Sequence, residues 1–222
     1  MAALARLGAL IEVIAQPIYT LLFGIATYGL YIVLWSAVNM AEKIVDLSLT
    51  QALQRIVPVA DEEASHGAVK FALLVTTIPA ALIAGLVTFF DPQIAGAISA
   101  SPEDTATLPQ MIALFAWALP LWTFVEVATS AARARRAFGP EIRLRIFWEQ
   151  CARLVFAVSF FFAGWTSNGL LLAHLLSLLL VSILSVRLLG RYYDLKMMIS
   201  APVPAGLRKL VLVSGIALSP AA

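Results

Sequence analysis

The chain has 222 residues, of which 61% are hydrophobic and only 13% are charged, and its mean hydropathy is +0.92. Soluble domains are about half apolar and about a quarter charged, so this composition excludes an ordinary soluble protein and indicates an integral membrane protein. The formal charge is +2, and the single cysteine, Cys151, excludes disulfides within the chain and cysteine-rich metal sites.

Six segments are long and apolar enough to cross a bilayer as helices, which takes about 20 residues each. They cover residues 5–24, 28–53, 69–90, 109–132, 144–165 and 168–190. Backbone groups in lipid must be satisfied internally, so these segments are predicted to be helices rather than strands. We expect an all-α, polytopic membrane helix bundle with three parts. Residues 1–190 form a six-helix lobe, 191–209 a cytoplasmic linker and 210–222 the start of a seventh helix.

The basic residues predict the orientation of the bundle. The turns at 23–29, 91–109 and 164–169 contain no lysine or arginine, whereas the turns and ends on the other side hold 13 of the 15 basic residues. Lysine and arginine concentrate on the cytoplasmic side of membrane proteins. The protein is therefore expected in the cytoplasmic (inner) membrane with a cytoplasmic N-terminus. The first segment carries Glu12 and lacks a cleavage site, which favours a retained helix over a signal peptide.

Ionisable and polar residues inside the predicted spans are the candidate substrate-binding residues. Each charge at the bilayer centre costs about 2.5–3.5 kcal/mol, so such residues are expected to face one another or water. We predict a hydrated cavity walled by the first, second, fourth and fifth helices and open to the cytoplasm. Its predicted lining is Glu12, Gln16, Asn39, Glu42, Lys43, Asp46, Glu126, Glu149 and Arg153.

Structural pairing is the alternative interpretation of the same charges. Lys43 could neutralise Asp46 within its helix, and Glu149 precedes Arg153 at the favourable i, i+4 spacing. His174, on an otherwise apolar helix, is expected to be packed and hydrogen-bonded rather than a proton relay. The acidic run at 61–66, "DEEASH", is expected to be a solvated loop.

An arginine-rich turn, "RARRAFGPEIRLR" (133–145), joins the fourth and fifth helices. It is expected to anchor the protein to the anionic cytoplasmic leaflet. Because arginine binds phosphate oxygens bidentately, the same residues could instead capture a phosphate or diphosphate headgroup. The candidates are Arg133, Arg135, Arg136, Arg143 and Arg145.

The sequence contains no Gly-rich phosphate loop, no HExxH motif and no Cys/His cluster. We therefore expect no enzyme activity, no metal site and no cofactor, and no nucleic-acid partner.

Two stretches resemble oligosaccharide flippases of the Wzx type, in the multidrug/oligosaccharidyl-lipid/polysaccharide exporter superfamily. The first is "LLFGIATYGLYIVLWSAVNMAEKIVDLSLTQALQRIVP" (21–58), which is similar to that family's first hairpin, with Ser48 where the family often has glycine. The second is "ARRAFGPEIRLRIFWEQCARLVFAVSFFFAGW" (134–165), which is similar to the junction of its fourth and fifth helices.

This resemblance implies a transporter of two six-helix lobes around a central cavity. It also implies flipping of polyprenyl-diphosphate-linked oligosaccharide from the cytoplasmic to the outer leaflet, for synthesis of cell-surface polysaccharide such as lipopolysaccharide. The family has about twelve helices, so the chain is expected to be an N-terminal lobe that needs a second lobe or a second copy. Membrane lipids are the other expected partners. Two alternatives stay open: cation-coupled efflux of small molecules, and a non-transporting membrane scaffold for polysaccharide assembly.

Overall fold

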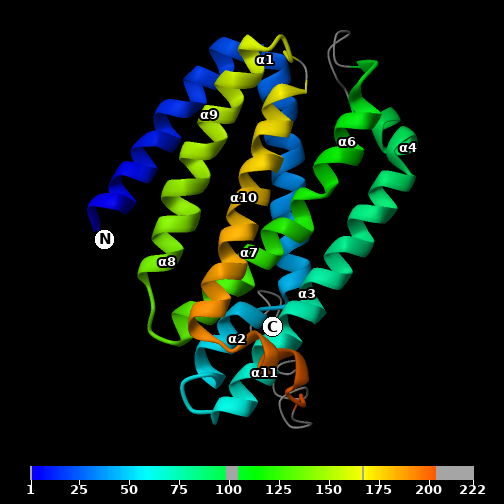
Figure 1. Cartoon of the computed structure of the whole chain (residues 1–222). Coiled ribbons are helices and arrows are strands. Elements are labelled where there is room, and N and C mark those ends of the chain that lie inside the picture. Colours follow the sequence, from blue (N-terminus) through cyan, green and yellow to red (C-terminus); the bar gives the residue numbers. More distant parts are fainter. Residues whose placement is uncertain (1, 99–104, 167, 204–222) are drawn as a thin grey trace, which may run out of the picture.

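The computed structural model describes residues 2–98, 105–166 and 168–203, and every regular element within these ranges is a helix (Figure 1). The helices are α1 (Ala2–Asp46), α2 (Leu49–Ile56), α3 (Glu62–Phe89), α4 (Asp91–Gly96), α6 (Leu108–Ala116), α7 (Ala118–Ala134), α8 (Gly139–Glu141), the π-helix η1 (Ile142–Trp148), α9 (Glu149–Phe162), α10 (Gly169–Tyr192) and α11 (Leu195–Ser200). Four stretches of the described residues are long and apolar enough to cross a membrane: Arg6–Asp46, Glu62–Phe89, Leu108–Ala134 and Gly169–Tyr192. The predicted all-α class is therefore confirmed.

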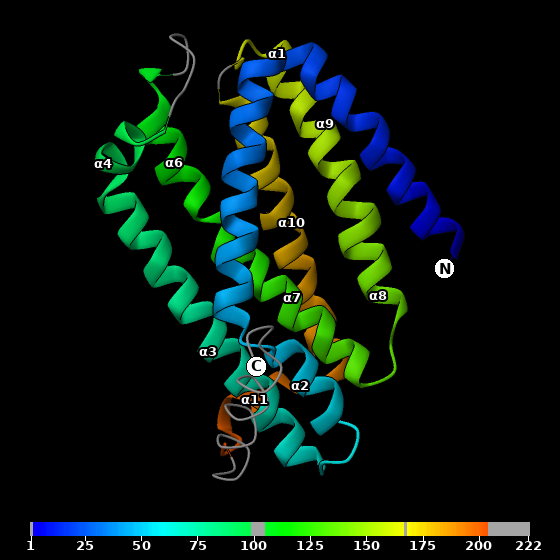
Figure 2. The same cartoon turned by 180° about the vertical axis from the view of Figure 1, so that it is seen from behind.

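α1 reverses its direction at Gly24 and so consists of a first arm (residues 2–23) and a second arm (residues 25–46). Gly24 has φ 82° and ψ 160°, a conformation that is essentially confined to glycine. Figures 1 and 2 show the first arm rising to this point and the second arm descending from it. The reversal lies where the sequence predicts a turn between its first two segments.

The second arm ends at Asp46, earlier than the predicted boundary at residue 53. Leu47 and Ser48 follow with φ of 46° and 60°, both in the left-handed region, and α2 then begins in a new direction. The Asp46 carboxylate accepts hydrogen bonds from the backbone N–H and the hydroxyl of Thr50, at 3.2 and 2.9 Å. The predicted segment 28–53 is therefore not one helix but is divided between the second arm and α2.

The acidic run at 61–66 is the start of α3, not the expected solvated loop. Asp61 caps the helix by accepting a hydrogen bond from the backbone N–H of Ala64 at 2.7 Å. Carboxylates favour helix N-termini because the helix dipole is positive there. Ser65 and His66 are buried at 1% and 3% exposure, so the run is part of the packed structure.

α6 and α7 form one stretch interrupted at Trp117. A proline ring clashes with the carbonyl of the residue four positions earlier. Pro120 therefore conflicts with the carbonyl of Ala116, which is the last residue of α6. The interruption follows from this proline.

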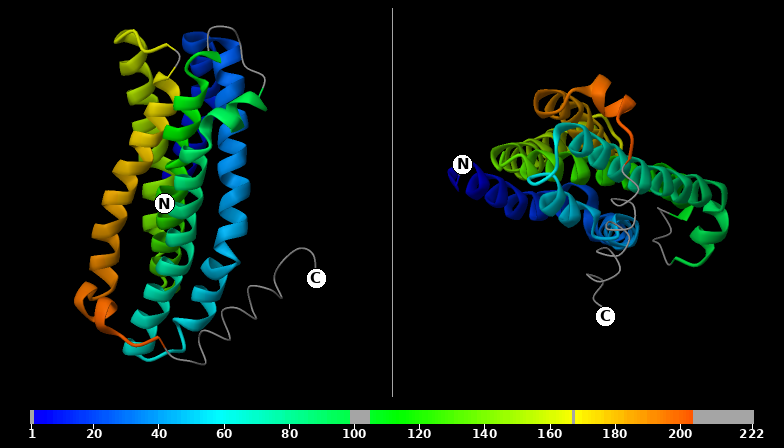
Figure 3. Two further views of the ribbon diagram at one scale, coloured as in Figure 1. Left: turned by 90° about the vertical axis from the view of Figure 1, so that its right-hand side faces the viewer. Right: turned by 90° about the horizontal axis from the view of Figure 1, so that it is seen from below.

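α7 is the central helix of the bundle. Its buried residues include the small side chains Ala128, Ala131 and Ala132, each at most 1% exposed, which let neighbouring helices approach closely. α7 packs against α10, α3 and α2. Seen from below, α10 lies at one edge of the bundle and α1 at the other (Figure 3). The predicted linker begins inside α10 and includes α11, and the predicted seventh helix at 210–222 lies outside the described residues.

Candidate functional site

The central cluster of the bundle is built around an ion pair on α9. Arg153 Nη2 lies 2.8 Å from Glu149 Oε1, and the two residues are 7% and 3% exposed. The same nitrogen, Nη2, donates a hydrogen bond to Gln150 Oε1 at 2.7 Å. The i, i+4 pair that the sequence predicted as a structural alternative is therefore formed, and it is buried.

Two residues from other helices complete the central cluster, which comprises Tyr31, Glu149, Gln150, Arg153 and His174. Arg153 Nη1 donates a hydrogen bond to the Tyr31 hydroxyl at 2.7 Å. The same hydroxyl forms a hydrogen bond with His174 Nδ1 at 3.1 Å. The other ring nitrogen, Nε2, lies 3.6 Å from Glu149 Oε1.

His174 is fully buried and packs against aromatic rings, with its ring centre 4.2 Å from that of Trp35 and 5.6 Å from that of Phe115. The prediction of a packed, hydrogen-bonded histidine is confirmed. The sequence did not identify Tyr31 as its partner, because the two residues are 143 positions apart and no local pattern links them.

A small polar hollow lies beside the central cluster, between the two arms of α1 and α9. Its lining includes Glu12, Gln16, Tyr19, Gln150 and Arg153, and its volume is about 70 Å³. Ligand-binding pockets are typically about 300–1,000 Å³, so the hollow has room for water but not for a substrate. Glu12 and Gln16 are exposed on the first arm at its edge.

A second group of charged residues lies where α7, α8 and η1 meet, and its two arginines and two glutamates pair with one another. Arg145 is 2.5 Å from Glu126 and 3.1 Å from Glu141, and Arg133 is 3.0 Å from Glu141. The Arg145 guanidinium also lies over the ring of Trp122, 4.7 Å from its centre. Glu126 had no partner near it in the sequence, and its partner comes from the arginine-rich turn.

The remaining predicted cavity residues lie on the second arm of α1. Glu42 is 1% exposed and pairs with Lys43 Nζ at 2.9 Å, while the Lys43 side chain itself is 77% exposed. The predicted Lys43–Asp46 pair is thus replaced by a Lys43–Glu42 pair, and Asp46 caps α2. The Asn39 amide donates to the carbonyl of Trp35 in its own helix at 3.0 Å. The small polar hollow is lined by Glu12, Gln16 and Arg153 of the nine predicted residues, and the role of all nine in binding stays a prediction.

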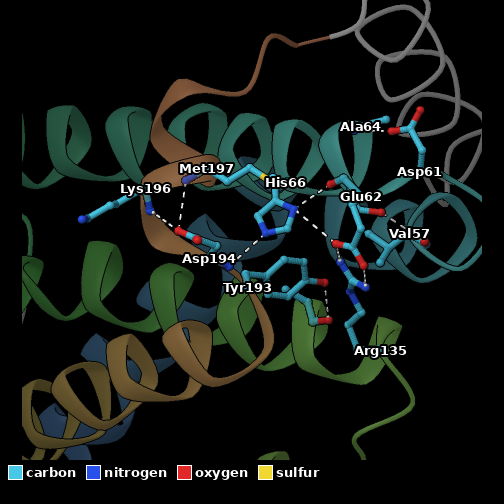
Figure 4. A network of polar contacts seen from close by, with 12 residues as sticks. Val57, Asp61, Glu62, Ala64, His66, Arg135, Tyr193, Asp194, Lys196 and Met197 are labelled. Carbon is cyan, nitrogen blue, oxygen red and sulfur yellow. Dashed lines mark hydrogen bonds and ion pairs between the residues drawn. The ribbon is translucent and has the colours of Figure 1, made fainter.

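A polar network that the sequence did not predict connects α3, α7 and the chain after α10 (Figure 4). We call it the latch, and it comprises Glu62, His66, Arg135, Tyr193 and Asp194. Arg135 donates two hydrogen bonds to the Glu62 carboxylate, at 2.7 and 2.6 Å. Its guanidinium also lies over the Tyr193 ring at 4.9 Å, and the Tyr193 hydroxyl donates to the backbone carbonyl of Ala131 at 2.8 Å.

The latch holds α11 against α3. The backbone N–H of Asp194 donates to His66 Nε2 at 2.9 Å. The Asp194 carboxylate caps α11 by accepting from the N–H groups of Lys196 and Met197, at 2.8 and 3.2 Å. These hydrogen bonds, with Met197 the larger contributor, lower the pKa of Asp194 below its ordinary value. Lys70 on α3 donates to the carbonyls of Ile199 and Ala201 at the far end of α11.

The structure divides the five arginines of the predicted headgroup site. Arg133, Arg135 and Arg145 are each paired with a carboxylate, as described above. Arg136 and Arg143 are exposed and form no ion pair with any residue that the structure describes. Most of the predicted cluster is therefore occupied by partners within the protein.

Among residues 2–98, 105–166 and 168–203, no group of three or more His, Cys, Asp or Glu side chains is placed to hold a metal ion. Comparisons of the chain with protein-family models, with curated proteins and with solved structures give no match.

Proposed function

We propose that this chain is one lobe of a membrane transporter that moves polyprenyl-diphosphate-linked oligosaccharide from the cytoplasmic to the outer leaflet. The proposal rests on the resemblance of 21–58 and 134–165 to Wzx-type flippases and on the membrane-length helices. Large apolar side chains such as Leu21, Ile25 and Leu82 are 84%, 81% and 64% exposed on these helices. Such surfaces suit lipid and are unfavourable in water.

The proposed topology has six crossings. They are the first arm and the second arm of α1, then α3, α6 with α7, η1 with α9, and α10. The arms of α1 count separately because α1 reverses at Gly24, and η1 adds its length to the shorter α9. The connections at one end contain no lysine or arginine, which supports a cytoplasmic location for the other end.

The observation that carries the proposal is the exposed polar edge on the first arm of α1. Glu12 and Gln16 are exposed on a helix of membrane length, next to the hollow that Arg153 and Gln150 line. A carboxylate facing hydrocarbon costs about 2.5–3.5 kcal/mol even on insertion scales. A second lobe or a second copy placed against this edge would replace the lipid by a hydrated protein interface. The substrate path would run along that interface.

In this mechanism the lobe moves as a unit. The central cluster ties α9 to the second arm of α1 and to α10 through Arg153, Tyr31 and His174. Alternating access then comes from rocking this lobe against its partner. Substrate binding shifts the balance between inward-open and outward-open states by its difference in affinity for the two.

The test is translocation of a fluorescent polyprenyl-diphosphate oligosaccharide in proteoliposomes. The chain alone is compared with the chain joined to a second six-helix lobe, and Glu12→Gln is introduced in the active form. Translocation by the assembled protein and its loss in Glu12→Gln are expected. The matched control is Glu63→Gln, which changes an exposed carboxylate in the first turn of α3. Transport that is equal in Glu12→Gln and wild type, or absent from the assembled wild type, would refute the proposal and favour a scaffold.

A further inference from the structure

A groove of about 290 Å³ runs between η1 and α10 near the lower end of the bundle. Three arginines line it: Arg143 from η1, and Arg187 and Arg191 from α10. Only Arg143 belongs to the headgroup site that the sequence predicted. The other two lie more than 40 residues later in the sequence, and folding brings them to the same groove.

These three arginines differ from the paired arginines of the bundle. All three are exposed, and none forms a hydrogen bond or an ion pair with another described residue. Arg187 and Arg191 are spaced i, i+4 on α10, so their guanidinium groups are neighbours on one helix face, where like charges repel. The groove therefore concentrates positive charge that the described part of the protein does not neutralise.

The rest of the groove is apolar and aromatic. Leu184 and Leu188 share the α10 face with the two arginines, and Leu144 faces them from η1. Trp148 and Tyr192 lie at its border, and Trp148 is 50% exposed. Tryptophan and tyrosine concentrate at the headgroup level of membranes. A guanidinium cluster above leucines, bordered by such rings, matches a ligand with an anionic head and a hydrocarbon chain.

We propose that this groove binds an anionic phospholipid of the cytoplasmic leaflet, with its phosphate among Arg143, Arg187 and Arg191 and an acyl chain along the leucines of α10. Arginine recognises phosphate oxygens bidentately, and basic pockets between membrane helices bind anionic headgroups. The groove shares no lining residue with the polar hollow, and its α10 wall is on the outer face of the bundle, at the opposite edge from α1 (Figure 3). A site on that outer face meets the bilayer, so the ligand is a bilayer lipid rather than the transported substrate. The proposal requires the membrane location but not the transport activity.

The test uses the purified full chain in a neutral detergent, with bound lipids counted by native mass spectrometry. The probes are phosphatidylglycerol, phosphatidylcholine, a polyprenyl diphosphate and inorganic phosphate. The variant is Arg143→Gln/Arg187→Gln/Arg191→Gln. Each basic residue near an anionic lipid contributes roughly fivefold in affinity, so phosphatidylglycerol binding is expected to weaken about a hundredfold. The matched control is Arg6→Gln/Arg55→Gln/Lys196→Gln, which removes the same charge from exposed positions outside the groove.

The proposal is supported if the wild type and the control retain one phosphatidylglycerol that the groove variant loses. Phosphatidylcholine and inorganic phosphate should bind much more weakly to all three proteins. If phosphatidylglycerol binding weakens equally in the groove variant and the control, the lipid is held by general attraction to positive charge, and the proposed site is overturned. Preferential, groove-dependent binding of the polyprenyl diphosphate would overturn the assignment to a bilayer phospholipid. Because the altered side chains are exposed, all three proteins should unfold at the same temperature, and lipid binding is measured without any translocation.

Discussion

At the residue scale, the central cluster places a full ion pair in the interior of an apolar bundle. Removing two charges from water costs several kcal/mol for each ion, and their attraction offsets this only when the geometry is good and other hydrogen bonds are made. Arg153 meets this condition only in part: Glu149 supplies the countercharge and Tyr31 and Gln150 accept hydrogen bonds, but Arg153 Nε and Glu149 Oε1 have no hydrogen-bond partner among the described residues. The pair is therefore sensitive to the loss of either partner.

Arg153→Met is expected to destabilise the protein by about 3–5 kcal/mol, because it leaves the Glu149 carboxylate buried without its countercharge. The double variant Glu149→Gln/Arg153→Met removes both charges and should be markedly more stable than the sum of the two single changes implies. The measurement is the free energy of unfolding in mixed micelles, followed by the fluorescence of the five tryptophans.

The control for this cycle is Arg133→Met, which removes the same side chain from a pair that is partly exposed. Such a pair contributes about 0–1 kcal/mol. Similar losses at Arg133 and Arg153, or additive single changes at Glu149 and Arg153, would contradict the view that the central pair is held by burial.

The sequence predicted this pair because its two members share one helix, but it could not predict the residues that surround it. The same limit applies to the arginine-rich turn. The sequence pattern does not distinguish its five arginines from one another. In the structure Arg135 forms an ion pair with Glu62 and Arg145 with Glu126, both on other helices, whereas Arg143 forms no ion pair with a described residue. Which arginines stay free is decided by how the helices pack.

At the scale of elements, the reversal of α1 depends on Gly24. Its φ of 82° and ψ of 160° are unfavourable for any residue with a Cβ, at a cost of about 1–3 kcal/mol. Gly24→Ala is therefore expected to lower the free energy of unfolding by about that amount, although no neighbouring atom would obstruct the new methyl group.

The comparison is Gly29→Ala, five residues along in the helical second arm, where a Cβ also meets nothing within 4 Å. Alanine in a helix interior is favoured over glycine by about 0.5–1 kcal/mol. The free energy of unfolding should therefore decrease in Gly24→Ala and increase in Gly29→Ala. Equal effects would show that the backbone at Gly24 is not the constraint on the reversal.

The docking of α11 is expected to weaken in acid. The pKa of Asp194 is lowered in the folded protein, so its carboxylate stabilises α11 fully above its ordinary pKa of about 4. This stabilisation is lost as the pH falls through the lower pKa of the folded state. Hydrogen-exchange protection of the amides of α11 should therefore be constant from neutral pH to about 5 and fall as the pH decreases below that.

Asp194→Asn separates this effect from other titrations, because its side chain can still accept hydrogen bonds but carries no charge. Protection in this variant should be lower near neutral pH and should change less with acidity. An acid response identical to that of the wild type would assign the change to other groups of the latch.

The length of each apolar segment was enough to predict that a helix is present, but it did not predict where several of the helices begin or end. α3 and α10 contain the predicted segments almost whole. The end of the second arm was missed because Leu47 and Ser48 adopt left-handed conformations that glycine or asparagine usually mark. The start of α3 was missed because "DEEASH" is polar, and only the cap at Asp61 and the contacts of His66 show that it is packed.

At the scale of the whole molecule, charge is separated along the bundle. Arg55 on α2 and Lys196 on α11 are exposed at the lower end of the bundle in Figure 1, and Arg136 and Arg143 are exposed on either side of α8, at the side of its lower half. α9 ends and α10 begins at the opposite end, near the reversal of α1 (Figure 1). A bilayer placed between these ends would put most of the basic residues that the structure describes on one side, as the positive-inside rule requires.

This placement predicts the accessibility of single cysteines in a Cys151→Ala background. Thr166→Cys, in an exposed position, should react with a membrane-impermeant maleimide in intact cells. Arg136→Cys, also exposed, should react only after the inner membrane is permeabilised. Denatured samples in which both cysteines react equally control for thiol reactivity. If Arg136→Cys were labelled in intact cells and Thr166→Cys were protected, the orientation would be inverted, and the groove of Arg143, Arg187 and Arg191 would face the outer leaflet.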